Sequence, residues 1–528
     1  MERPAHLSVV LHAHLPFIRH PEHDYHLEEF WFFEALHETY LPLLQMLDRL
    51  EADGISGALT LSVSAPLLAM MEDYLLRERF LAYLGRIIEL SDRDRRGDDA
   101  SIQEVADYYH RRLTGLRTYF VDTLQGDLIA ALRHHAQTPR LELMTCVGTH
   151  PILPFLATPE GRRAQIEVGL DYFEARFGAR PRGIWVAECA FEPGVDELLA
   201  EAGVAFACLE DRAIDNAASA PVYGTYSPLI SEGGVAFFGR DQEASSQVWS
   251  ADEGYPGDYD YREFYRDRGY DLPLDEVAPY IHPDGIRHDT GLKYHRITGD
   301  VALDEKAVYR PDQAAQKARE HARHFLECRI KQAAEAADKM GARPPHITCP
   351  YDAELFGHWW FEGPLFLEEL FRAAHERDEI LLSTPPHFLE AVDVHQQATP
   401  ATSTWGEDGY FAVWLDESNA EIYGPLRRAE RAMVELAGRY EGGDETLRRA
   451  LRQAARELVL AQSSDWPFII KTGTTVEYAW SRLTGHLDAF WTLVEMIEAA
   501  QVDLDQVTSM EERQTIFAEI DPLLWAAR

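Results

Sequence analysis

The feature of this sequence that most constrains its fold is a series of short apolar segments that each lead to a histidine or an acid. The segments read HLSVVLHAH, LELMTCV, GIWVAE and HITCPYD, and each has the length and composition of a buried strand. In an α/β barrel the carboxyl ends of the parallel strands converge on one cleft, where catalytic groups gather. The sequence therefore predicts an α/β barrel whose cleft holds His12, His14, His150, Glu188 and Asp352.

Other segments complete this pattern of strands and helices. Further strands are expected at 57–63, 204–208, 235–238 and 379–382, which brings their number to seven or eight. One helix is marked at both ends, because Thr158 and Pro159 are typical of a capped helix start and Gly178 of a helix end. Helical insertions are expected at about 66–135 and about 190–235.

The amino-acid composition of the chain changes near residue 395. A polar connection rich in Ala, Thr and Pro is followed by three strongly helical stretches, at about 424–440, 444–463 and 474–500. Between the last two lies the segment SSDWPF, which places Asp465 beside a tryptophan. The sequence thus predicts a catalytic domain over residues 1–395 and a helical C-terminal domain over residues 396–528 that completes the active-site cleft.

The segment HITCPYDAELFGHWW combines acids with aromatic rings. Carboxylates beside exposed indoles suit sugar chemistry, because acids move protons or attack C1 while flat rings stack on sugar faces. An alternative is that Asp352 caps a helix and that the tryptophans are buried. Together with Glu188, Asp352 supplies the two carboxylates that glycoside cleavage requires, although the residues by themselves do not assign the two roles.

The pair His12 and His14 allows two interpretations. Alternation along a strand puts both imidazoles on one face. They could ligate a metal, as in a metal-dependent polysaccharide deacetylase, or clamp sugar hydroxyls. We favour sugar contacts, because no partner set of Asp and His stands at a recognisable spacing. A catalytically inactive glucan-binding scaffold is a third possibility, against which the intact acids argue.

Charge and cysteine content narrow the partners and the compartment. A net charge of −39 repels nucleic acid and anionic membranes, whereas a neutral substrate is compatible with it. No run approaches the roughly 18 apolar residues of a membrane span, and the N-terminus lacks the pattern of a signal peptide. Five cysteines without a CxxC spacing indicate a reducing compartment. We expect a cytoplasmic protein.

Residues 240–270 contain no obvious regular element in the sequence pattern. Trp249 and several tyrosines stand there among glycines, acids and prolines, a composition with too many rings for a simple linker. We expect an aromatic loop over the barrel mouth that provides platforms for sugars. Gly254 and Gly257 would let the backbone approach a ligand closely.

Seven blocks of this sequence carry a resemblance to a known family. They are HAHLP, the Thr149–His150 pair, IWVAE, QVWSADEGYPGDYDYREFY, CPYDAELFGHWW, TWG at 404–406 and SSDWPF. On these blocks the chain resembles glycoside hydrolase family 57, and within it the 1,4-α-glucan branching enzyme group, nearly from end to end. The resemblance implies a distorted (β/α)7 TIM-like barrel, a helical C-terminal domain over the cleft, and a retaining reaction that converts an α-1,4 link into an α-1,6 branch.

The resemblance also implies roles for individual residues. By motif position Glu188 would be the nucleophile and Asp352 the general acid/base. The implied substrate contacts are Arg240, Gly257, Trp405, Asp465, His12, His14 and His150, with Trp249 and Trp414 as stacking rings. No metal or other cofactor is implied. The expected partner is an α-glucan such as amylose or a glycogen-like polymer, bound by a monomer or a small homo-oligomer.

The sequence departs from the family pattern in two places. Ala187 precedes Glu188 where family members often carry proline. The stretch between Glu188 and Arg240 is short for a branching enzyme, in which a long loop here carries a tyrosine that shields the intermediate from water. Tyr223 or Tyr226 could stand in for that tyrosine. Without such a lid, hydrolysis would rise relative to transfer, so an amylase-like hydrolase or a 4-α-glucanotransferase of the same family is the alternative.

Overall fold

A ring of parallel strands forms the centre of the molecule. The computed structural model describes residues 4–250, 254–393, 395–406, 409–440 and 442–527. In one sheet β4 (Ile184–Trp185), β3 (Leu141–Cys146), β2 (Leu59–Val63), β1 (Ala5–Ala13) and β8 (His346–Asp352) follow one another, and β9 (Ile380–Leu382) pairs with the start of β1. A second sheet has the order β10 (Gln396–Gln397), β6 (Leu229–Ile230), β7 (Ala236–Gly239) and β5 (Phe206–Leu209).

Two isolated parallel bridges join the sheets into a barrel. Gly183 pairs with Phe206 between β4 and β5, and Arg240 pairs with Thr348 between β7 and β8. Within the described residues, seven parallel strands thus follow one another around the ring, in the order β1, β2, β3, β4, β5, β7 and β8. Because closure depends on single bridges rather than full ladders, the barrel is distorted. The predicted (β/α)7 fold class is confirmed.

The apolar composition of β1 accounts for its central place. All nine residues of AHLSVVLHA are buried, as expected of a strand that is covered on both faces. Its neighbours are in register at the functional end, where His12 lies opposite Ser62 on β2 and opposite Asp352 on β8.

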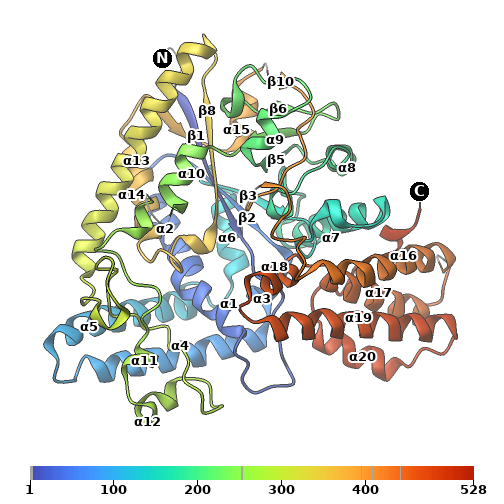
Figure 1. Cartoon of the computed structure of the whole chain (residues 1–528), viewed down its shortest axis with the longest axis horizontal. Helices are drawn as coiled ribbons and strands as arrows, with labels where there is room; N and C mark the ends of the chain where they lie inside the picture. Colours follow the sequence, from blue (N-terminus) through green and yellow to red (C-terminus); the bar gives the residue numbers. More distant parts are fainter. Residues whose placement is uncertain (1–3, 251–253, 394, 407–408, 441, 528) are drawn as a thin grey trace.

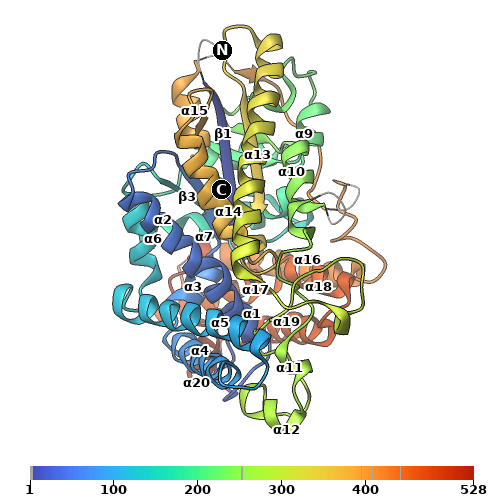
Figure 2. The same cartoon turned by 90° about the vertical axis from the view of Figure 1, so that its left-hand side faces the viewer.

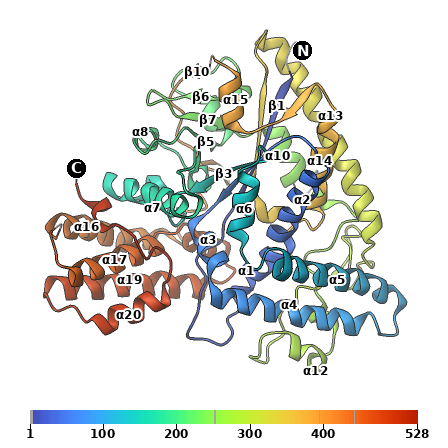
Figure 3. The same ribbon diagram turned by 180° about the vertical axis from the view of Figure 1, so that it is seen from behind.

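Helices cover the outside of the ring. The long α13 (Pro311–Met340) packs along α14 (Gly363–His375) and against β1 and β8 (Figure 2). Behind β3 lie α6 (Leu128–Ala136) and α7 (Pro159–Phe177) (Figure 3). The expected ends of α7 are confirmed, because the Thr158 hydroxyl accepts the Gly161 N–H at 3.0 Å and Gly178 adopts φ 82°.

Both stretches in which helical insertions are expected contain helices, and the second also contains a barrel strand. After β2 the chain forms α3 (Ala65–Glu72), α4 (Tyr74–Asp94), α5 (Ala100–Thr118) and α6, as predicted for about 66–135. The stretch 190–235 contains α8 (Val195–Glu201) and α9 (Asp211–Asp215), but also the barrel strand β5. Two short helices thus flank β5, which confirms the strand expected at 204–208 within this stretch.

The C-terminal part of the chain is helical from residue 420 onward. It consists of η11 (Ala420–Ile422), α16 (Tyr423–Arg439), α17 (Glu445–Ala461), α18 (Asp465–Thr472), α19 (Val476–Glu498), α20 (Leu504–Arg513) and η12 (Pro522–Trp525) (Figure 1). The expected boundary at residue 395 falls just before β10, which pairs with β6. Residues 396–406 thus accompany the barrel before the helices begin.

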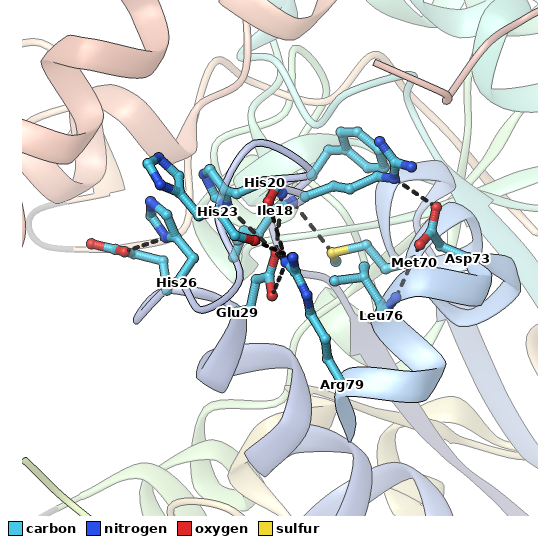
Figure 4. A network of polar contacts seen from close by, with 12 residues as sticks. Ile18, His20, His23, His26, Glu29, Met70, Asp73, Leu76 and Arg79 are labelled. Atoms are coloured by element: carbon cyan, nitrogen blue, oxygen red, sulfur yellow. Dashed lines mark hydrogen bonds and ion pairs between the residues drawn. The ribbon is translucent and has the colours of Figure 1, made fainter. Parts of the chain in front are cut away.

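The loop after β1 is held by polar contacts from the start of α4 (Figure 4). A further contact comes from the C-terminal helix α20. Arg79 Nη1 donates to both carboxylate oxygens of Glu29 at 2.7 and 2.8 Å and to the carbonyl of His20 at 3.2 Å. Arg19 donates to Asp73 at 2.8 Å and to the carbonyl of Glu512 at 2.8 Å. These bonds fix the chain that leaves the functional end of β1.

Candidate active site

Three histidines meet at the carboxyl ends of β1 and β3. His12 Nε2 lies 3.0 Å from His150 Nε2, and the rings of His14 and His150 stack with centroids 4.0 Å apart. His12 also stacks on Trp185 at 4.6 Å. Burial, and then the neighbouring imidazoles, lower the pKa of His12 and His150 well below the usual value. These two rings are neutral at pH 7 and offer hydrogen bonds rather than charge.

The C-terminal helices complete this cluster. His14 Nε2 lies 3.1 Å from the Asp465 carboxylate at the start of α18, and Ser464 Oγ lies 2.8 Å from His150 Nδ1. The Ser464 N–H donates to the His150 carbonyl at 3.0 Å. Burial raises the pKa of Asp465, but the charge and hydrogen bond of His14 outweigh it, so that the pKa is lowered overall. The segment SSDWPF therefore brings a charged carboxylate into the cleft.

Glu188 stands in a strained turn directly after β4. Its φ is 57° and that of Cys189 is 50°, both in the left-handed region that non-glycine residues rarely adopt. Its carbonyl accepts the Trp405 N–H at 2.7 Å, and its Oε1 lies 3.8 Å from His150 Nδ1. His150 has a φ of 63°. Clustered outliers of this kind indicate a functional site, since packing must maintain the strain.

The two strand-end carboxyl groups interact with each other. Burial, then the charges of Asp352 and Asp465, raise the pKa of Glu188 well above its usual value. Burial raises the pKa of Asp352 to about 6, although the charges of Arg240 and His14 lower it. The pair therefore binds its protons less independently than two exposed acids would. Near neutral pH it can supply one proton donor and one carboxylate.

Arg240, directly after β7, adds a positive charge to the site. Its guanidinium donates to Glu210 Oε2 at 3.0 Å and to Ser245 Oγ at 2.5 Å. It lies 4.6 Å over the Trp405 ring. Trp249, which is 37% exposed, stands edge-on to Trp405 with centroids 6.1 Å apart. These aromatic and charged groups border the carboxylates on the side of β7.

A cavity of about 320 Å³ opens beside Arg240 and Trp249, and its walls also include Glu210, Ser245 and Gly406. Trp249 is the last residue of the helix α10 (Gln242–Trp249). The prediction that residues 240–270 hold no regular element is therefore wrong. The Asp241 side chain accepts the Ala244 N–H at 2.8 Å and caps that helix.

Two implied contact residues stand apart from this arrangement. Trp414 is 2% exposed and packs with Ile152 and Ala190, and Gly406 lies against its ring. This burial leaves almost no face for a sugar, so Trp414 supports the Trp405–Gly406 turn from below. Gly257 ends a short turn, η6 (Tyr255–Gly257), that packs against α10.

Neither candidate lid tyrosine faces the cleft. Arg343 donates to the Tyr223 hydroxyl, and Arg343 precedes the start of β8, whereas Asp352 ends that strand. The hydroxyl of Tyr226 accepts Gln332 Nε2 at 3.1 Å on α13, outside the ring. Because catalytic groups lie at the other end of β8 and on the inner side of the ring, the expectation that Tyr223 or Tyr226 shields the site is wrong.

Sequence reasoning missed the support given by Tyr40 and gave Glu354 no role. Glu354 Oε1 accepts the His14 N–H at 3.2 Å and the Tyr40 hydroxyl. Burial, then the charge of Asp352, raise the pKa of Glu354 to about 8. The position of Glu354, two residues after Asp352, could have marked it as part of the site. No feature of the sequence marks Tyr40, because it reaches the site from a π-helical turn, η1 (Leu36–Tyr40).

His12, Cys146 and His150 bring three possible metal donors within 4.8 Å of one another. Burial, then the charge of Glu188, raise the pKa of Cys146, which keeps it a thiol, whereas metals bind the thiolate. Both imidazoles also face serine hydroxyls, at 3.2 Å for His12 and 2.8 Å for His150. This donor set fits hydrogen bonding to a neutral ligand better than metal ligation.

Comparison with known proteins identifies the family. The model of glycosyl hydrolase family 57 matches residues 8–402. This chain belongs to glycosyl hydrolase family 57. A second model, 1,4-alpha-glucan branching enzyme, C-terminal, matches residues 425–525, the helical part.

Relatives match the chain over nearly its whole length. The 1,4-alpha-glucan branching enzyme TK1436 of Thermococcus kodakarensis is 32% identical, over 97% of this chain and 77% of that protein. The structure of the alpha-amylase AmyC from Thermotoga maritima is 38% identical with a TM-score of 0.93, and 99% of each chain is covered. That of the family 57 branching enzyme from Pyrococcus horikoshii is 28% identical with a TM-score of 0.89, over 99% of this chain and 97% of the other.

In the part of the chain that the structure describes, no helix combines the length and the apolar content needed to cross a membrane.

Proposed function

We propose that this member of family 57 is a 1,4-alpha-glucan branching enzyme that works by retaining transglycosylation. The observation that carries the proposal is the pair of buried strand-end acids, Glu188 and Asp352, which both have raised pKa values and stand beside the imidazoles of His12 and His150. The similarity to TK1436 and the match of the branching-enzyme C-terminal model support it. The substrate is a neutral α-glucan, in keeping with a net charge of −39, and the compartment is the cytoplasm.

The reaction proceeds in two displacements on one carboxylate. Both carboxyl groups have raised pKa values, and the reaction requires the proton of the pair to stand on Asp352. Glu188 then attacks C1 of the donor sugar while Asp352 gives its proton to O4 of the leaving chain, so that the α-1,4 bond breaks and a glycosyl-enzyme forms. Asp352, now a carboxylate, accepts the proton of the acceptor 6-hydroxyl, whose oxygen attacks C1 and releases Glu188. Two inversions retain the α configuration, and the product carries an α-1,6 branch.

The surrounding residues hold the donor sugar for this exchange. His12, His14, His150 and Asp465 present hydrogen-bonding groups, and Asp465 is already tied to His14 at 3.1 Å. The remaining contact residues are Arg240, Gly257, Trp405 and Trp249, of which Trp249 offers the exposed ring. The buried Trp414 acts through the turn that it supports. No metal is required, and the protein works as a monomer or a small homo-oligomer.

An α-glucan hydrolase is the second candidate. The similarity to AmyC, at 38% identity and a TM-score of 0.93, favours it, as does the placement of Tyr223 and Tyr226 away from the cleft. With water free to reach C1 of the glycosyl-enzyme, hydrolysis competes with transfer.

Incubation with amylose separates the two activities. Proton NMR detects new α-1,6 linkages, and a parallel assay counts new reducing ends. New α-1,6 signals with few reducing ends are expected of a branching enzyme, whereas reducing ends without branches would identify a hydrolase. Glu188→Gln should abolish both products. The matched control is Glu192→Gln, the same substitution four residues on, where the side chain pairs with Arg162 at 2.8 Å outside the cluster.

A further inference from the structure

We propose that His282, Asp284 and His288 form a binding site for a divalent transition metal such as Zn²⁺, remote from the carboxylates of the cleft. The three residues lie in the sequence IHPDGIRH, and their donor atoms are all within 4.8 Å of one another. Two imidazoles and one carboxylate are a donor set that Zn²⁺, Co²⁺ and Ni²⁺ accept. The site lies outside the proposed reaction and does not depend on it.

The geometry centres on a single carboxylate oxygen. Asp284 Oδ2 lies 3.1 Å from His282 Nδ1 and 2.8 Å from His288 Nε2. Ligands about 2.0–2.1 Å from a tetrahedral Zn²⁺ stand about 3.3 Å from each other, so the two distances that involve Asp284 Oδ2 need to change by only a few tenths of an ångström. The two rings meet edge to face at 80° with centroids 5.8 Å apart, so they approach the carboxylate from different directions.

The turn prepares the carboxylate for this role. Asp284 Oδ1 accepts the Ile286 N–H at 2.8 Å, and Gly285 takes φ 80°, which leaves Oδ2 to the histidines. A carboxylate oxygen held in this way is a ligand of the kind that Zn²⁺ binds.

One of the histidine nitrogens has a carboxylate neighbour but no well-directed hydrogen bond. His282 Nδ1 is shielded from solvent and makes no hydrogen bond, although Asp284 Oδ2 is 3.1 Å away. The Tyr25 ring packs edge to face on His282 at 5.1 Å and holds its orientation. A metal ion between the three atoms would satisfy this nitrogen. The side chains remain 18%, 26% and 23% exposed, so an ion could enter and keep water as its other ligand.

A metal here would close the short loop 282–288 on itself and so stiffen part of a long irregular segment. The chain continues directly into Thr290 and Gly291, whose N–H groups donate to the buried Asp267 at 2.7 and 2.9 Å. The preceding helix α12 (Leu274–Val277) lies beyond α4 at the lower edge of Figure 1, away from α18 at the cleft. The site is therefore structural, and its occupancy should raise Tm.

The test is a zinc titration of the full-length protein after EDTA treatment and dialysis. Calorimetry and metal analysis after gel filtration should give one equivalent of Zn²⁺ that is lost, or bound about tenfold or more weakly, in His282→Ala and His288→Ala. Addition of ZnCl₂ should raise Tm of the parent protein but not of these variants. Asp284→Asn, which keeps the size of the side chain, should lose the same equivalent and guards against a fold defect.

His134→Ala is the matched control. His134 belongs with Glu51 and His135 to another group of converging donors, and its side chain is 60% exposed. This variant should bind zinc as the parent does. The proposal is overturned if the parent binds no zinc, or if His282→Ala, His288→Ala and Asp284→Asn bind it with unchanged stoichiometry and affinity. Co²⁺ gives an independent readout, since a visible absorption band of the bound ion should disappear with His288→Ala.

Discussion

Replacement of Glu38 by glutamine should test how η1, which follows β1, stabilises the loop after Asp352. Glu38 pairs with Arg262, and the two side chains are 2% and 0% exposed. Glu38 Oε2 lies 2.7 Å from His358 Nδ1, and Arg262 donates to the His358 carbonyl at 2.6 Å. The pair thus joins η1 to the loop that follows Asp352.

The expected cost follows from the burial of both charges. Removal of one partner of a buried ion pair costs about 3–5 kcal/mol, because the other charge is left uncompensated in a medium of low dielectric constant. Glutamine keeps the volume of the side chain and can accept one hydrogen bond. We therefore expect Glu38→Gln to lower the free energy of unfolding by about 3 kcal/mol. The control is Glu276→Gln, whose partner Arg93 is 40% exposed, and for such surface pairs the cost is about 0–1 kcal/mol.

Urea unfolding followed by tryptophan fluorescence measures the difference. Burial alone would raise the pKa of Glu38, but the Arg262 charge and the His358 bond hold it well below its usual range. A lowered pKa stabilises the fold above the unfolded value of about 4.3, and this contribution is lost as the pH falls further. The difference in the free energy of unfolding between the parent and Glu38→Gln should therefore become smaller as the pH falls from about 5 to 3. A cost below about 1 kcal/mol at pH 7, equal to that of Glu276→Gln, would refute the reasoning.

Four further substitutions test the site and the residues that support it. Arg240→Gln removes a charge that lowers the pKa of Asp352 from a level set by burial, so this pKa should rise from about 6 and the basic limb of kcat/KM against pH should move up by about one unit; an unmoved limb would contradict this. Trp249→Ala should raise KM for amylose without lowering Tm, whereas Trp414→Ala should cost about 3–5 kcal/mol in urea; the opposite pattern would exchange their roles. Gly357→Ala should lower soluble yield and Tm, because φ is 124° and a Cβ would lie 1.9 Å from a carbonyl oxygen of η1; a parent-like Tm would count against this.

The sequence by itself determined the strands and the residues at their ends. A buried strand needs an unbroken apolar run, and alternation alone puts His12 and His14 on one face, where the structure has their rings stacked 5.8 Å apart. Glu188 and Asp352 follow from the same rule, because parallel strands end at one rim. The two ends of α7 could also be predicted from the sequence, since Thr158 and Gly178 act on neighbouring backbone groups.

Only the tertiary structure decided what depends on distant partners. Closure of the ring through single bridges, the burial of Trp414 and the reach of Tyr40 to Glu354 leave no local pattern. The bond between Ser464 and His150 joins residues more than 300 positions apart. Local spacing reports the period of one element, whereas pKa values, burial and cleft walls arise from how several elements pack. That is why the acids could be named in advance and their raised pKa values could not.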